Sequence, residues 1–146
     1  MVYTFRVIIY LVTIFFILSC NSKQNRHPLL IPNDNTKEYP IDSGANLTFK
    51  NKTIDFGNIS ADTLLTAKYK FFNTGENDVV IYYVNPDCSC TNYYLSNDTI
   101  LPGDSAFIIL EFSTANRFGQ QKIYATVCAN TFDKFYKLTL KTNILR

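Results

Sequence analysis

The chain has 146 residues, of which 47% are hydrophobic, 15% aromatic and 18% charged. This length suits one ordinary domain, and the apolar content excludes a wholly disordered chain. The chain has 14 Lys and Arg residues and 12 Asp and Glu residues, so its net charge is +2. This small net charge excludes the strongly positive surface of a typical nucleic-acid-binding protein. The single histidine, His27, excludes most general-base and zinc-site designs.

The amino terminus has the pattern of a targeting segment. Arg6 precedes an uncharged run over residues 7–19, which reads VIIYLVTIFFILS. A span of the hydrocarbon core needs about 20 apolar residues, so this run is too short and has instead the length of a signal-peptide core. It stops at Cys20, with a branched residue three positions before the cysteine and a small residue directly before it. This arrangement resembles a bacterial lipobox.

The lipobox resemblance implies cleavage before Cys20 and acylation of its sulfur and new amino group. Lipid chains then anchor the protein, with each buried methylene contributing about 0.8 kcal/mol. An ordinary secretory signal with a cysteine nearby by chance is the alternative. The next residue, Asn21, is not the Asp that retains lipoproteins in the inner membrane of enteric bacteria, and no acidic patch for surface export follows. We therefore predict a lipid-anchored protein of the bacterial outer membrane that faces the periplasm.

Three segments follow from this pattern: a signal peptide over 1–19, the lipidated cysteine with a flexible tether over 20–46, and a domain over 47–146. The tether is polar, contains three prolines and has no period of 2 or 3.6. His27 lies in the tether and therefore outside the predicted domain. The remaining 100 residues are a suitable length for one β-sandwich.

Strand patterns recur along the domain and are separated by turn residues. The predicted strands cover residues 65–71, 79–84, 106–112, 122–128 and 135–144, the last two forming a pair. The strand over 79–84 is apolar on both faces, as expected of a central strand, with Tyr82 and Tyr83 on opposite faces. No helical period of useful length and no internal repeat is present in the sequence. The patterns predict an all-β fold, an immunoglobulin-like antiparallel β-sandwich of about seven strands.

An ordered series of short motifs crosses the domain: Asp55-Phe56-Gly57-x-Ile59, Phe71-x-Asn73-Thr74-Gly75, Cys88-x-Cys90-Thr91 and Leu101-Pro102-Gly103, then Phe112, Gly119 and Asn130. Over about residues 53–145 the series resembles the bacterial domain-of-unknown-function 1573 family. That family consists of small, often lipid-anchored Ig-like domains, similar in fold to the major-sperm-protein, PapD and ASH group. The resemblance implies a fold and a location, and it supplies no established activity. The family usually has Gly where this chain has Ser89, which predicts a loop that needs no positive φ there.

Cys88 and Cys90 form the main candidate chemical site. With Cys20 acylated, three cysteines remain, so complete intramolecular pairing is excluded. Two extended residues span up to about 6.6–7.2 Å, near the upper Cα separation of about 6.8 Å for a disulfide, so a bridge needs a bent loop. The spacing leaves open a structural bridge or small apolar caps, a redox site, a soft-metal site for Cu(I), and a disulfide-linked dimer. Zinc is disfavoured because it usually takes four ligands and the domain has no histidine.

Cys128 is the candidate unpaired thiol. It ends the strand over 122–128 and lies toward the opposite end from Cys88 if that strand runs antiparallel to 79–84. The sequence predicts no catalytic residue and no cofactor, since a cysteine nucleophile needs a base or a positive neighbour. Asp87, the charge nearest to Cys88 in sequence, would raise the pKa of that thiol.

Three Asp-Ser/Thr pairs that continue into an apolar residue give candidate O-glycosylation sites at Thr63, Thr99 and Ser105. The triplet resembles the site that some gut-dwelling Gram-negative bacteria use on exported proteins. Turn-to-strand boundaries generate the same triplet, because Asp hydrogen-bonds its own backbone in turns. Both readings remain open from the sequence.

The main prediction is a lipid-anchored cell-envelope protein whose domain is a non-catalytic binding or scaffold module. A partner would add a strand at a sheet edge or contact a Tyr-rich face, since the chain has 12 Phe and 10 Tyr. The alternative is a thiol-redox or copper-handling protein that uses Cys88 and Cys90, although no thioredoxin-like βαβ pattern surrounds them. The expected partners are the membrane, through the lipid anchor, and a protein or envelope component; nucleic acid is not expected.

Overall fold

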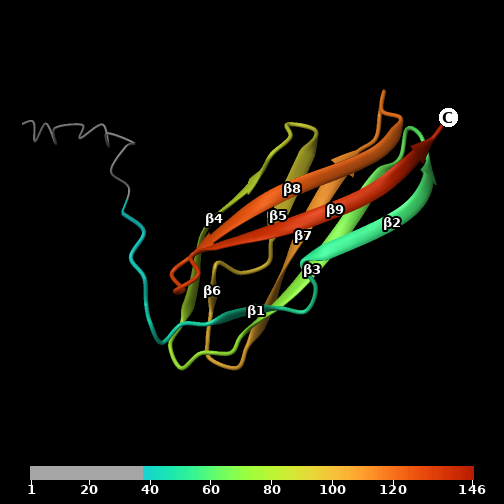
Figure 1. Ribbon diagram of the computed structural model, residues 1–146. Coiled ribbons are helices and arrows are strands. Elements are labelled where there is room, and N and C mark those ends of the chain that lie inside the picture. Colours follow the sequence, from blue (N-terminus) through green and yellow to red (C-terminus); the bar gives the residue numbers. More distant parts are fainter. Residues whose placement is uncertain (1–37) are drawn as a thin grey trace, which may run out of the picture. The chain divides into compact units, whose positions relative to one another are not determined.

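The computed structural model describes residues 38–146 (Figure 1). The predicted signal peptide, Cys20 and the tether up to residue 37 lie outside the described residues. Within residues 38–146, no helix has the length and apolar character needed to cross a membrane.

Two facing β-sheets make up the fold. The strands are β1 (Leu47–Phe49), β2 (Thr53–Ser60), β3 (Leu64–Asn73), β4 (Val79–Pro86), β5 (Thr91–Leu95), β6 (Thr99–Ile100), β7 (Ser105–Ser113), β8 (Gly119–Ala129) and β9 (Phe135–Leu145). The four-stranded sheet has the order β1-β3-β7-β5 and the five-stranded sheet the order β2-β9-β8-β4-β6 (Figure 1). The predicted all-β sandwich is confirmed, and the five predicted strands correspond to β3, β4, β7, β8 and β9.

One strand pair departs from the predicted antiparallel arrangement. β2 pairs with β9 in parallel, whereas the other pairs in the two sheets are antiparallel. After β1 the chain crosses to the second sheet, where β2 pairs with a strand far along the chain. For example, Asn58 of β2 contacts Asn143 of β9, which is 85 residues later. A pairing of this range leaves no signal in the local pattern of β2.

The core lies between the two sheets. Alternation along β3 buries Ala67, Tyr69 and Phe71, each with 1% or less of its surface exposed, against Leu138 and Leu140 of β9. Polar residues of β3 face solvent at the intervening positions. The Tyr69 hydroxyl donates a hydrogen bond of 2.8 Å to the Thr139 carbonyl, which joins the two sheets through the core.

Residues 38–46 belong to the folded unit, although the sequence placed them in the tether. The compact unit begins at Glu38. Asp42 donates from its backbone nitrogen to the Asn130 carbonyl at 2.6 Å and accepts from Asn77 Nδ2 at 2.9 Å, and Ala45 is 4% exposed. The composition of this segment predicted a tether because its stabilising partners lie far along the chain.

A β-bulge in β4 changes the predicted positions of Tyr82 and Tyr83. The step from Ile81 to Tyr83 on β4 faces the single step from Ala129 to Cys128 on β8, so β4 contains one extra residue. The rings of Tyr82 and Tyr83 both pack on Tyr39, with centroid distances of 5.0 and 5.5 Å. The prediction that they lie on opposite faces is therefore wrong, because the bulge shifts the alternation of side chains by one residue.

Candidate functional site

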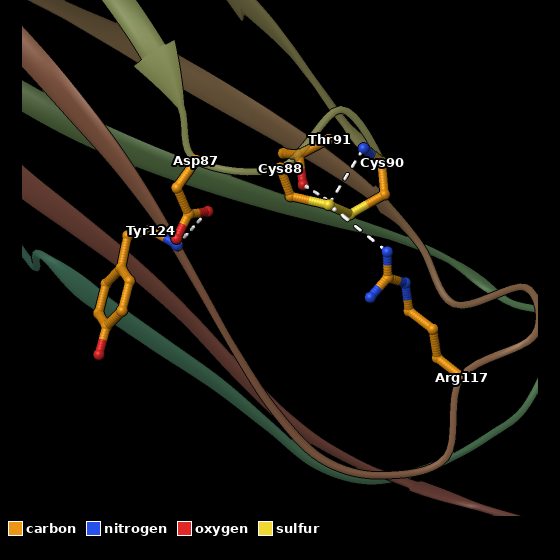
Figure 2. The surroundings of a disulfide bond; sticks show 6 residues. All are labelled: Asp87, Cys88, Cys90, Thr91, Arg117 and Tyr124. Carbon is orange, nitrogen blue, oxygen red and sulfur yellow. Dashed lines mark hydrogen bonds between the residues drawn. A yellow bond between two sulfur atoms is a disulfide. The ribbon is translucent and has the colours of Figure 1, made fainter.

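The turn between β4 and β5 contains the Cys88–Cys90 disulfide (Figure 2). The two Cα atoms are 5.1 Å apart, closer than two extended residues, because the turn bends at Ser89. The Cys88 carbonyl accepts from the Thr91 nitrogen at 3.1 Å, and the Cys90 carbonyl accepts from the Ser113 nitrogen at 3.2 Å. The first bond closes the turn, and the second attaches it to the end of β7.

Ser89 stands where the family usually has Gly, and its backbone explains why the exchange is tolerated. In the described part of the chain, the non-glycine residues with positive φ are Asp62, Asn116 and Lys134. Ser89 is not one of them, so this turn does not require the conformational freedom of glycine.

Arg117, on the connection between β7 and β8, supplies the positive charge at the disulfide. Its Nη2 donates to Cys88 Sγ at 3.5 Å, and the Cys90 backbone nitrogen donates to the same sulfur at 3.1 Å (Figure 2). The guanidinium carbon lies 5.5 Å from the centroid of the Phe112 ring, which supports this position. The arrangement can stabilise negative charge on Cys88 Sγ.

The Asp87 carboxylate, the charge nearest to Cys88 in sequence, is hydrogen-bonded to the backbone of β8. Its Oδ1 accepts from the Tyr124 backbone nitrogen at 3.0 Å, and its own nitrogen donates to the Tyr124 carbonyl at 3.0 Å (Figure 2). These two bonds turn the carboxylate toward β8. Sequence reasoning missed Arg117 because it lies 29 residues from Cys88 on a separate loop, and no local motif includes it.

Cys128 is a free thiol that is fully buried on β8. It pairs with Tyr83, whereas Pro86, next to the disulfide turn, pairs with Ala125. The two cysteine sites therefore lie apart along the β4–β8 pair. Burial raises the pKa of the Cys128 thiol, which disfavours its reactive thiolate form.

β5 follows the disulfide turn directly and forms the edge of the four-stranded sheet. The Ser96 nitrogen donates to the Phe107 carbonyl, so alternation turns the backbone groups of Tyr94 toward β7 and those of Tyr93 toward the open edge. Tyr93 and Tyr94 are 48% and 57% exposed. An open hollow of about 700 Å³ follows this edge along residues 93–98.

A second, polar hollow of about 490 Å³ crosses β2, β9 and β8. It is lined by Asp55, Gly57, Asn58, Gln120, Gln121, Lys122, Lys141, Thr142 and Asn143. Among these lining residues Asp55 is the one carboxylate, so the hollow lacks the pair of carboxylates that glycoside hydrolysis uses. In residues 38–146 no three His, Cys, Asp or Glu side chains are grouped so as to hold a metal ion.

The candidate glycosylation residues Thr63 and Thr99 make their side-chain hydrogen bonds outside the disulfide turn. Thr63 is part-buried, and its Oγ1 donates to the Ser60 carbonyl at 3.0 Å. Thr99 is exposed, with its Oγ1 donating to Asp98 Oδ1 at 3.1 Å, and Ser105 is exposed at the start of β7. Their modification remains a prediction.

The strand order and the two facing sheets define an immunoglobulin-like β-sandwich of the PapD-like type. The chain belongs to the family described as "Protein of unknown function (DUF1573)", which matches residues 47–144. The resemblance drawn from the ordered motifs is thereby confirmed. Among curated proteins there is no significant match.

Solved structures from several organisms share this fold. A protein of unknown function from Porphyromonas gingivalis W83 is similar with a TM-score of 0.62 and 12% identity, over 75% of this chain and 51% of that one. The ASH/PapD-like domain 7 of human CEP192 is similar with a TM-score of 0.51 and 11% identity, over 76% of this chain and 92% of that domain. The secreted serine protease VesC of Vibrio cholerae is similar with a TM-score of 0.51 and 14% identity, over 70% of this chain and 23% of the protease. At these identities the similarity shows the fold alone.

Proposed function

We propose that this protein is a lipid-anchored component of the bacterial cell envelope whose domain acts as a binding module for a protein partner. The partner contributes an extended segment that pairs with the open edge of β5. The observation that carries the proposal is that β5 is an unprotected edge strand with two exposed tyrosines. Strand addition of this kind derives its affinity from backbone hydrogen bonds and its specificity from side chains beside the new strand.

The other sheet edges are less suited to this role. β1 has three residues and β6 has two, which is too short for an extended ladder. β2 has a register irregularity between Asp55 and Asn58, and such bulges protect an edge from pairing. β5 pairs continuously with β7 over Thr91–Leu95 and contains no Lys or Pro.

Aromatic side chains next to this edge provide contact area for a partner. The Tyr94 ring lies 6.1 Å from the Phe107 ring on β7, and the Lys68 ammonium lies 3.8 Å from the centroid of Phe107. Rigid aromatic rings lose little conformational entropy when they are covered, and tyrosine is common at binding hot spots. The outer face of the sheet therefore continues the proposed surface beyond the strand edge.

A pair of substitutions at Tyr93 tests the strand-addition mode. Tyr93→Ala removes the side chain and keeps the outward N–H, whereas Tyr93→Pro removes both, at a position whose N–H does not serve the β7 ladder. Envelope proteins captured by each variant are quantified by mass spectrometry, with Phe132→Ala, 84% exposed on the β8–β9 turn, as the matched control. We expect capture to be reduced by Tyr93→Ala, abolished by Tyr93→Pro and unchanged by Phe132→Ala. Equal capture by all three variants would contradict the proposal.

The lipobox pattern at Cys20 supports the anchor and the envelope location. Metabolic labelling with a palmitate analogue, followed by separation of inner and outer membranes, tests both. We expect the wild-type chain to be labelled and to sediment with the outer membrane, and the Cys20→Ser variant to be unlabelled. An unlabelled wild-type chain released into the soluble fraction would favour the ordinary secretory signal.

The two alternatives at the cysteines differ in their support. Copper handling requires thiolate donors, and the sulfurs of Cys88 and Cys90 are joined to each other in this structure. The thiol-redox alternative has one specific observation in its favour, the Arg117 guanidinium at Cys88 Sγ.

A further inference from the structure

We propose that the Cys88–Cys90 disulfide is a thiol–disulfide exchange site for dithiols, in which Cys88 is the leaving thiolate and Arg117 stabilises it. This activity is independent of strand addition at β5, because it uses the side chains of the preceding turn and the β7–β8 loop. It assigns distinct roles to two sulfurs that the sequence alone leaves equivalent.

The asymmetry of the hydrogen bonds around the two sulfurs carries this inference. Cys88 Sγ accepts from the Arg117 guanidinium at 3.5 Å and from the Cys90 backbone nitrogen at 3.1 Å. The polar neighbour of Cys90 Sγ is the neutral Thr91 hydroxyl at 3.8 Å. A cationic donor stabilises a thiolate more than a neutral one does, so negative charge is favoured on Cys88.

The position of the disulfide allows a small thiol to reach it. Cys88 and Cys90 are both partly exposed, and Cys90 packs on one side against the core. Of the charged groups around the turn, Arg117 faces Cys88 Sγ from the β7–β8 loop, whereas the Asp87 carboxylate is turned to the Tyr124 backbone on β8 (Figure 2). An incoming thiolate therefore meets a positive charge at the sulfurs.

The exchange balances as a two-electron transfer. One thiolate of the dithiol attacks Cys90 Sγ, the S–S bond breaks, and its electron pair remains on Cys88 as a thiolate beside Arg117. The second thiolate of the dithiol then attacks the first sulfur of the dithiol, which is bonded to Cys90 in the mixed disulfide. The bond to Cys90 breaks, and Cys90 leaves as a thiolate and takes up a proton. The dithiol becomes a disulfide and gives up two electrons and two protons, of which one proton is bound by Cys90 and one enters solution. A thiol of low pKa leaves faster, which favours this order.

The first test measures the alkylation rate of reduced Cys88 as a function of pH, with the modified residue located by tandem mass spectrometry. We expect the midpoint of this pH profile to lie at least about one pH unit below the ordinary thiol pKa of about 8.5. Arg117→Met should return it toward that value and lower the thiolate fraction about tenfold at low pH, and Arg117→Lys should restore most of the effect. Arg146→Met, which removes a guanidinium packed on Phe118, is the matched control and should match the wild type. An unchanged midpoint in Arg117→Met would overturn the role of Arg117.

The second test locates the mixed disulfide. Oxidised full-length protein is exposed to reduced glutathione, and the reaction is quenched with an alkylating reagent. We expect glutathione on Cys90 and the alkyl group on Cys88. Glutathione on Cys88 would overturn the assignment of the leaving group, and a disulfide that resists millimolar glutathione and dithiothreitol in the folded protein would show a structural bridge instead. Because neither test involves β5, failure here leaves the proposed binding function standing.

Discussion

Replacement of Asn73 by alanine should be among the more damaging single changes at a polar residue of this domain. Asn73 ends β3 with 1% of its surface exposed. Its Nδ2 donates to the carbonyls of Asn77 and Ile100, both at 2.8 Å, and its Oδ1 accepts from the Gly75 nitrogen at 2.9 Å. Each bond contributes about 1 kcal/mol net, so three bonds sum to about 3 kcal/mol of the free energy of unfolding. The side chain thus holds together the β3–β4 turn and the end of β6.

Urea unfolding followed by circular dichroism measures this loss. With a slope of about 1.5 kcal/mol per molar, a loss of about 3 kcal/mol moves the midpoint down by about 2 M. Asn143→Ala is the matched control, because Asn143 makes one exposed bond, to Asn58 Oδ1 at 2.8 Å, and its removal should cost less than about 0.5 kcal/mol. Equal midpoints for the two variants would refute the view that this motif asparagine is structural.

Three further predictions concern ionisation, thiol reactivity and a close backbone approach. Burial raises the pKa of Tyr69 above its ordinary value of about 10, so the folded protein keeps a proton that the unfolded chain releases. The unfolding free energy should therefore fall as the pH rises above about 10, and urea titrations should show a smaller fall for Tyr69→Phe. Cys128 should resist iodoacetamide at about pH 8 in the folded protein and react fully in urea, since it is 0% exposed and burial raises its pKa; native alkylation would contradict the buried position. Gly75→Ala should lower the melting temperature more than Gly103→Ala, because a Cβ at Gly75 would overlap the Gly44 carbonyl oxygen, whereas at Gly103 it meets open space and costs about 1 kcal/mol for a φ of 82°. Similar melting temperatures would exclude this overlap.

The sequence predicted the strands whose faces differ clearly in polarity. In β3, Leu65, Ala67 and Tyr69 alternate with polar residues that face solvent, so period and burial coincide. β5 gave no such signal, because as an edge strand it buries Thr91 and leaves Asn92 to Tyr94 exposed. β2 was missed because its alternation of polar and apolar residues is interrupted after Gly57, where the register shifts, and because it pairs with a strand far along the chain.

The sequence predicted only part of the candidate site. The spacing of Cys88 and Cys90 marked the turn, but the charge that faces them comes from Arg117 on a loop that no local motif connects to it. The bulge at Tyr82 could not be foreseen either, since an extra residue is defined by the register of the partner strand. Local pattern therefore predicts elements, whereas the site depends on which loops the topology brings together.

The stability that the disulfide can contribute is small compared with that of the asparagine motif. A bridge with a sequence separation of 2 closes a very short loop, and the chain-entropy relation gives about 1.6 kcal/mol for such a loop. This is about half of the loss expected for Asn73→Ala. The turn is also held without the sulfurs, because the Cys90 carbonyl accepts from Ser113 and the Cys88 carbonyl from Thr91. The domain should therefore remain folded when Cys88 and Cys90 are both replaced by serine, because the bridge contributes little to the stability of the fold.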